Sequence, residues 1–128
     1  MIDMKWRAGW TVLVLTLVMP LGCRQRAQQS EPEQARETLR RALDAWQKGE
    51  SPDALQKQSS ITAVDPYWQA GVRLTQYEII GDGNSSGFDW QCHVRLSLQD
   101  NGGNSSQVKA TYSISTAPAL VIVRSEDS

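Results

Sequence analysis

Cysteine and histidine are the side chains best suited to chemistry in this chain, and it holds few of them. Its 128 residues include one histidine, His93, and two cysteines, Cys23 and Cys92. One histidine excludes motifs that need two, and two cysteines exclude a cysteine-rich zinc site, so we expect no metal and no cofactor. Cys92 alternates with apolar residues, which predicts a buried, inert thiol.

His93 lies on the polar side of an alternating segment, residues 88–99. If this segment pairs with residues 107–115, polar side chains of both meet on one surface. That candidate binding face consists of His93, Arg95, Lys109 and Thr111. It would be mildly cationic and could hold an anionic group, the alternative being an ordinary solvated sheet face. Asp89 is about 13 Å along the same strand, too far to orient His93 for catalysis.

The first 23 residues have the layout of an export signal. Trp10 to Gly22 carries no charge, with Lys5 and Arg7 before it and Arg24 after it. A basic start followed by about a dozen apolar residues is typical of a secretory signal. A comfortable membrane span needs roughly twenty residues.

The junction Leu21-Gly22-Cys23 resembles the lipobox of bacterial lipoproteins. The resemblance implies that the Cys23 thiol is diacylated and that cleavage makes Cys23 the new N-terminus. An uncleaved apolar anchor and an ordinary cleaved signal are the alternatives, and all three place the remaining chain outside the cytoplasm. We therefore expect a signal peptide (1–22), a lipidated tether (23–29) and a domain (30–128), anchored to a membrane of the cell envelope.

Composition limits what that domain is. The 13 basic and 14 acidic side chains give the chain a net charge of −1, which argues against a nucleic-acid partner. The length suits one small domain. Helical spacing of apolar residues predicts a helix from a capping Ser30 to Gly49, with a short second helix at 51–58 and a turn at Asp65-Pro66.

From residue 72 the apolar residues recur with a period of two. This predicts strands over 72–80, 88–99, 107–115 and 120–124, with a bulge near Gln76 in the first. Glycine-rich hairpin loops are expected at 81–87 and 100–105. The predicted fold class is α+β, with the N-terminal helix packed on a four-stranded antiparallel meander.

This arrangement resembles cystatin-like and nuclear-transport-factor-two-like domains, in which a helix lies on a curved antiparallel sheet. It is also similar to small envelope proteins of unknown function that carry such a domain behind a lipobox. The segments that carry the likeness are Asp65-Pro66-Tyr67-Trp68, Tyr77-Glu78-Ile79, Tyr112-Ser113-Ile114 and Val121-Ile122-Val123-Arg124 after Pro118. The inhibitory signature of cystatins, Gln-x-Val-x-Gly, is absent from the first hairpin, so protease inhibition is not carried over.

Together these observations predict a lipid-anchored, non-catalytic interaction module. Its partners would be membrane lipid through Cys23 and another envelope protein, with a homodimer through the sheet face as a further arrangement. The alternative is a small-molecule-binding or enzymatic domain with a pocket between helix and sheet. That pocket would be lined by Trp46, Trp68, Trp90 and Tyr112, with His93 or Asp65 as its polar group. A cavity above roughly 300 Å³ would favour this alternative.

Overall fold

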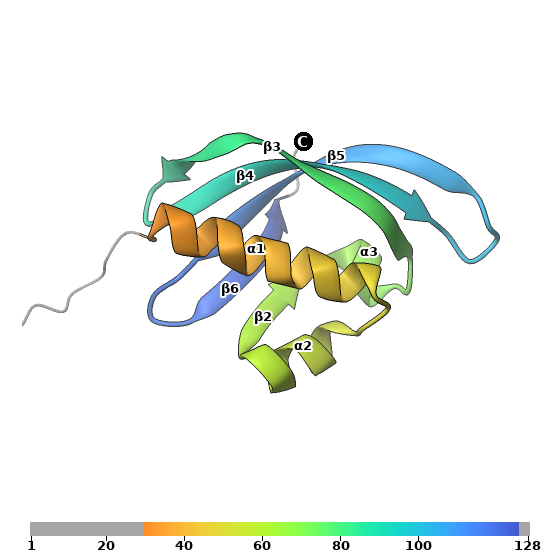
Figure 1. Cartoon of the computed structure of the whole chain (residues 1–128), viewed down its shortest axis with the longest axis horizontal. Helices are drawn as coiled ribbons and strands as arrows, with labels where there is room; N and C mark the ends of the chain where they lie inside the picture. The colour runs from red at the N-terminus through yellow and green to blue at the C-terminus, as the bar shows by residue number, and fades with distance from the viewer. Residues whose placement is uncertain (1–29, 126–128) are drawn as a thin grey trace, which may run out of the picture.

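The computed structural model describes residues 30–125, which form helices packed against one sheet (Figure 1). The elements in chain order are α1 (Pro32–Gln47), α2 (Pro52–Ser59), β2 (Ile61–Val64), α3 (Pro66–Gln69), β3 (Arg73–Ser86), β4 (Asp89–Gln99), β5 (Ser105–Ser115) and β6 (Leu120–Ser125). The expected signal peptide (1–22) and the whole of the expected tether (23–29), with Cys23, lie outside the described residues.

Helix α1 buries the stripe that its sequence predicts. The buried apolar positions are Ala35, Leu39, Ala42, Leu43, Ala45 and Trp46. The predicted cap is wrong by one residue, because the side chain of Glu31, not of Ser30, accepts the Gln34 N–H (2.9 Å). Ser30 instead accepts the Thr116 N–H (3.0 Å), a partner 86 residues away that no local pattern indicates. The helix ends before Gly49, whose φ of +91° suits glycine.

The sheet has five strands in the order β2-β6-β5-β4-β3. Strands β3 to β6 form the predicted antiparallel meander. The prediction of four strands is wrong, since β2 pairs in parallel with β6, from Ile61 opposite Leu120 to Val64 opposite Val123. The sheet is therefore mixed. Four residues alternate too briefly for the period to be recognised in the sequence.

Strand β3 is longer than its sequence predicts. A register shift between Leu74 and Gln76 confirms the expected bulge. Residues 81–86, predicted as a hairpin loop, continue the strand after a second irregularity between Ile80 and Asn84. Gly83 lies in this stretch with φ +89°, and any Cβ there would clash with the Trp90 indole. The glycines therefore permit the irregular backbone of this strand, and the chain turns only after Ser86.

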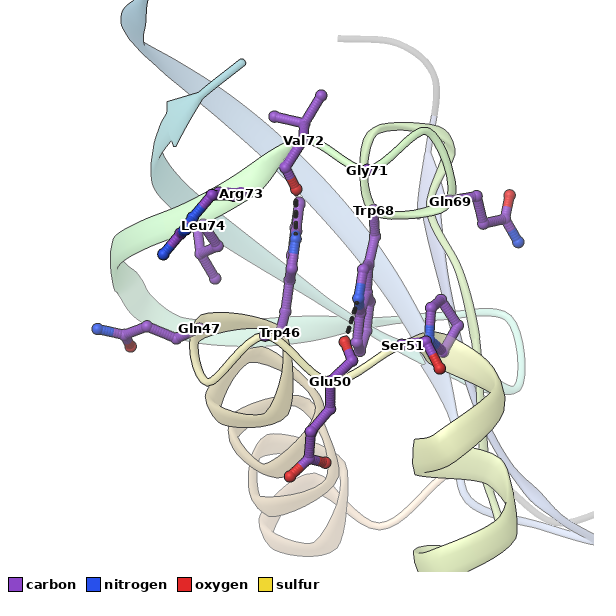
Figure 2. A pocket seen from close by; sticks show the side chains of 12 residues that line it. Trp46, Gln47, Glu50, Ser51, Trp68, Gln69, Gly71, Val72, Arg73 and Leu74 are labelled. Carbon is purple, nitrogen blue, oxygen red and sulfur yellow. Dashed lines mark hydrogen bonds between the residues drawn. The ribbon is translucent and has the colours of Figure 1, made fainter. Parts of the chain in front are cut away.

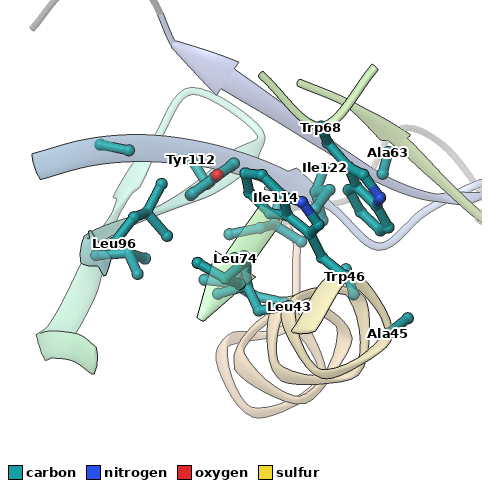
Figure 3. Close-up of a cluster of buried hydrophobic side chains, with 14 of the residues drawn as sticks. Leu43, Ala45, Trp46, Ala63, Trp68, Leu74, Leu96, Tyr112, Ile114 and Ile122 are labelled. Carbon is teal, nitrogen blue, oxygen red and sulfur yellow. The ribbon is translucent and has the colours of Figure 1, made fainter. Parts of the chain in front are cut away.

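The core lies between α1 and the inner face of the sheet (Figure 3). Strict alternation along β4 and β5 supplies much of it, including Cys92, Val94 and Leu96 from β4 and Tyr112 and Ile114 from β5. The opposite face of the sheet has no described element packed over it (Figure 1).

Candidate functional site

The pairing of β4 with β5 assembles the candidate binding face. His93 stands opposite Thr111, and Arg95 stands opposite Lys109. The His93 Nδ1 lies 3.0 Å from the Thr111 Oγ1. Because the neighbouring residues of β4 are buried in the core, these four side chains share the outer face of the sheet.

A carboxylate from β3 changes the charge of this face. The Arg95 guanidinium donates to Glu78 Oε1 over 2.6 Å, and the two residues are register partners. Beside the pair is a shallow hollow of about 270 Å³ lined by Gln76, Tyr77, Glu78, Arg95, Ser97 and Gln107. The face is therefore more nearly neutral than its four sequence-selected residues suggest. Water screens the exposed pair, so it contributes about 0–1 kcal/mol to stability.

No carboxylate is bonded to His93 in the described part of the chain. Its ring partner is the Thr111 hydroxyl. Asp89 accepts a hydrogen bond from Ser113 Oγ (3.2 Å) instead, and Glu78 is paired with Arg95. His93 thus has a hydroxyl neighbour but not the orienting acid that a general base requires.

Asp65 lies at the centre of a buried polar network, although its sequence predicts a simple turn. It is 1% exposed and caps α3 by accepting the Tyr67 N–H (2.9 Å). Its other oxygen accepts the Tyr112 hydroxyl proton. The partner strand lies 47 residues away, so this contact was not visible in the sequence. Desolvation, reinforced by the Asp65 charge, raises the pKa of Tyr112 far above its usual value of 10.

Arg124 supplies the positive charge of the same network. Its guanidinium nitrogen is 3.8 Å from Asp65 Oδ2, and only 12% of the side chain is exposed. The guanidinium also lies over the Tyr67 ring, 4.5 Å from the centroid, and 5.9 Å from the Tyr112 centroid. Such cation–π contacts and the nearby carboxylate compensate a buried charge. The network therefore holds α3 to β5 and β6, with Asp65 and Tyr112 enclosed and the Tyr67 ring 42% exposed.

A cleft of about 310 Å³ lies at the C-terminal end of α1 (Figure 2). We call it the tryptophan cleft. It is bounded by the end of α1, the turn into α2, α3 and the start of β3. Trp46 and Trp68 stack there with ring centroids 5.3 Å apart and planes 10° apart. Each indole N–H donates over 2.8 Å to a backbone carbonyl, Trp46 to Val72 and Trp68 to Glu50.

These hydrogen bonds define the chemistry of the cleft. Both indole N–H groups are satisfied and the side chains are only 3% and 5% exposed, so the rings offer the cleft a small area of aromatic surface and no free donors. Glu50 and Gln69 extend their polar ends away from the stacked rings (Figure 2). Arg73 and Ser51 complete a polar rim. The cleft can therefore hold a small apolar or aromatic group, oriented by contacts at its edge.

The cleft differs from the pocket expected between helix and sheet. Trp46 and Trp68 line it, but Trp90 and Tyr112 do not. Tyr112 is completely buried and bonded to Asp65, while the Trp90 indole donates to Asp82 O (3.1 Å). His93 lies on the outer face of the sheet. Among the described residues, buried apolar side chains of α1 and the sheet, including Leu39, Val94 and Ile114, pack where that pocket was expected.

Cys92 is fully buried, and desolvation raises the pKa of its thiol. Thiolate formation is therefore disfavoured, in agreement with the predicted inert cysteine. Within residues 30–125, no three histidine, cysteine, aspartate or glutamate side chains are grouped as a metal site would need. No helix in that range is long and apolar enough to cross a membrane.

Comparisons with known protein families, curated protein sequences and solved structures found no match to this chain.

Proposed function

We propose that this protein is a lipid-anchored, non-catalytic interaction module of the cell envelope, held to the membrane through Cys23. The observation that carries the proposal is the junction Leu21-Gly22-Cys23 at the end of an uncharged apolar run. Each methylene of an acyl chain buried in lipid contributes about 0.8 kcal/mol, and stable anchoring needs more than one chain. A diacylated Cys23 meets that requirement.

The candidate catalytic side chains already have partners within the domain, which supports a binding role over a catalytic one. Asp65 is enclosed with Tyr112 and Arg124, so substrate cannot reach its carboxylate. His93 is bonded to a hydroxyl. A binding role needs only accessible surface, which the outer face of the sheet and the tryptophan cleft both provide.

Another envelope protein is the partner we propose for the outer sheet face. The polar side chains of this face and its Arg95–Glu78 pair suit a reversible contact, because the rims of protein–protein interfaces are polar. A second copy of this chain is the competing occupant. Sedimentation velocity of residues 30–128 distinguishes these two occupants. A concentration-dependent dimer would favour the second copy, and a monomer would favour another envelope protein.

The anchor is tested by replacing its thiol. Cys23→Ser should move the full-length protein from the membrane to the soluble fraction and abolish incorporation of a fatty-acid label. Cys92→Ala is the matched control, because it removes the other cysteine and should leave both properties unchanged. If Cys23→Ser protein stays with membranes after a high-salt wash, the proposed anchor is wrong.

A second candidate function is small-molecule binding in the tryptophan cleft. Its volume of about 310 Å³ reaches the lower end of the range for ligand pockets, and its stacked indoles offer apolar surface. Titration with indole, followed by NMR, should shift the side-chain N–H signals of Trp46 and Trp68. The Trp90 signal is the internal control and should not move. Equal shifts in all three, or none, would remove this candidate.

A further inference from the structure

Two turns hold the first described residue at one end of the sheet. The Ser30 N–H donates to Phe88 O (2.8 Å), and its Oγ accepts the Thr116 N–H (3.0 Å). Glu31 donates its N–H to Thr116 Oγ1 (3.1 Å). Figure 1 shows the start of α1, the β3–β4 turn and the β5–β6 turn at this end, with the β4–β5 turn at the other. The chain arriving from Cys23 therefore joins the domain between these two turns.

The distance from Cys23 to Ser30 is short. The positions differ by seven residues (30 minus 23), and an extended chain advances at most about 3.6 Å per residue. Ser30 can therefore lie no more than about 25 Å from an acylated Cys23. Arg24 and Arg26 in the connecting segment favour a close approach to anionic headgroups. The two turns can thus reach the bilayer surface.

Both turns expose apolar side chains. Phe88 is 61% exposed, more than any other large hydrophobic side chain in residues 30–125. Ala117, Pro118 and Ala119 are exposed in the β5–β6 turn. We call these four residues the apolar tip. Aromatic and aliphatic groups of this kind gain free energy at the boundary between lipid headgroups and acyl chains.

Three carboxylates at this end of the domain make contacts within it. Asp89, next to Phe88, accepts from Ser113 Oγ (3.2 Å). Glu31 caps α1 through the Gln34 N–H, and Glu33 pairs with Arg36 (3.3 Å). These contacts partly compensate the negative charge beside the tip, which would otherwise oppose approach to an anionic bilayer.

We propose that the apolar tip inserts into the headgroup–acyl boundary of the membrane that carries the Cys23 anchor. The inference rests on the acylation proposed above and adds an orientation to it. Helix α1 has 16 residues and is about 24 Å long. The tryptophan cleft at its far end then faces away from the lipid, where a ligand or partner can reach it.

Site-specific fluorescence tests the orientation in the full acylated protein. Phe88→Cys carries an NBD probe, and the protein is reconstituted in vesicles of phosphatidylethanolamine and phosphatidylglycerol. Ala119→Cys provides a second, independent probe in the other turn, in case the first variant does not fold. Asn101→Cys, in the β4–β5 turn at the opposite end, is the matched control. Buried Cys92 and acylated Cys23 should not react with the label.

The tip probes should emit at shorter wavelength than the Asn101 probe and lose intensity when the lipids carry headgroup nitroxides. Tip probes that behave like the control would overturn the inference. A blue shift without nitroxide quenching would also overturn it, because protein would then cover the tip. Failure of the proposed anchor can be distinguished from failure of the orientation. Cys23→Ser protein that remains on membranes would refute acylation, whereas the probe result alone decides the orientation.

Discussion

Replacing Tyr112 by phenylalanine tests the buried network that holds α3 to the sheet. The change keeps the ring and removes only the hydroxyl that donates to Asp65. A hydrogen bond to a buried carboxylate contributes about 1.5–3 kcal/mol, and its loss leaves one Asp65 oxygen with only the more distant Arg124. We therefore expect Tyr112→Phe to lower the free energy of unfolding by about 2 kcal/mol at pH 7.

The same variant should have a distinctive pH dependence. The pKa of Tyr112 is raised in the folded protein above the value of about 10 that it has when unfolded, so its stabilising contribution is complete below pH 10. Above pH 10 the unfolded chain loses this proton and the folded chain keeps it. Stability then falls by about 1.4 kcal/mol per pH unit for this one phenol. Tyr112→Phe removes that part of the decline. The difference in free energy of unfolding between the native protein and Tyr112→Phe should therefore become smaller from pH 10 to pH 11.

Urea unfolding followed by tryptophan fluorescence at pH 7, 10 and 11 measures both effects. Tyr77→Phe is the comparison variant. Burial and the Asp44 hydrogen bond raise the pKa of Tyr77 to about 12, so its contribution is complete below pH 10 and is lost between pH 10 and pH 12, as for Tyr112 over that range. If Tyr112→Phe is as stable as the native protein at pH 7, or keeps the native decline above pH 10, the Asp65–Tyr112 bond is not stabilising as argued.

Three further substitutions test local features. Gly83→Ala should lower the free energy of unfolding by more than about 2 kcal/mol, measured by thermal or urea unfolding, because the added Cβ would clash with β4. Gly81→Ala is the control: its Cβ would meet open space, so only the smaller effect of a positive φ is expected. Arg95→Gln should change stability by less than about 1 kcal/mol, since its pair with Glu78 is exposed; a larger loss in urea unfolding would contradict this. Trp46→Phe should lower stability by about 1–2 kcal/mol through loss of its carbonyl hydrogen bond and ring area, and an unchanged urea midpoint would argue against that bond.

The sequence predicted those parts of the fold that have a long regular period. Sixteen residues of α1 repeat the helical spacing often enough to identify its buried face. Strands β4 and β5 have eleven residues each, and apolar and polar residues alternate along most of both, which also predicted that Cys92 is buried. The proximity of His93 to Thr111 followed once those two strands were paired, since register fixes which side chains are opposite.

Features that depend on distant contacts could not be predicted. Strand β2 has four residues and is identified only by its partner β6. Asp65 looks like a turn residue until Tyr112 and Arg124 are brought beside it. Glycines at 81–87 indicate a turn by composition, but tertiary pairing places Gly83 in an irregular strand. The tryptophan cleft arises from how α1, α3 and β3 meet, which no local pattern encodes.

The proposed anchor is tested most directly by the intact mass of the protein isolated from the membranes of its natural host. Acylation of Cys23 predicts a chain that begins at Cys23 and carries the additional mass of a diacylglycerol group, with or without a further acyl chain. A chain that retains an unmodified Cys23 thiol would contradict it.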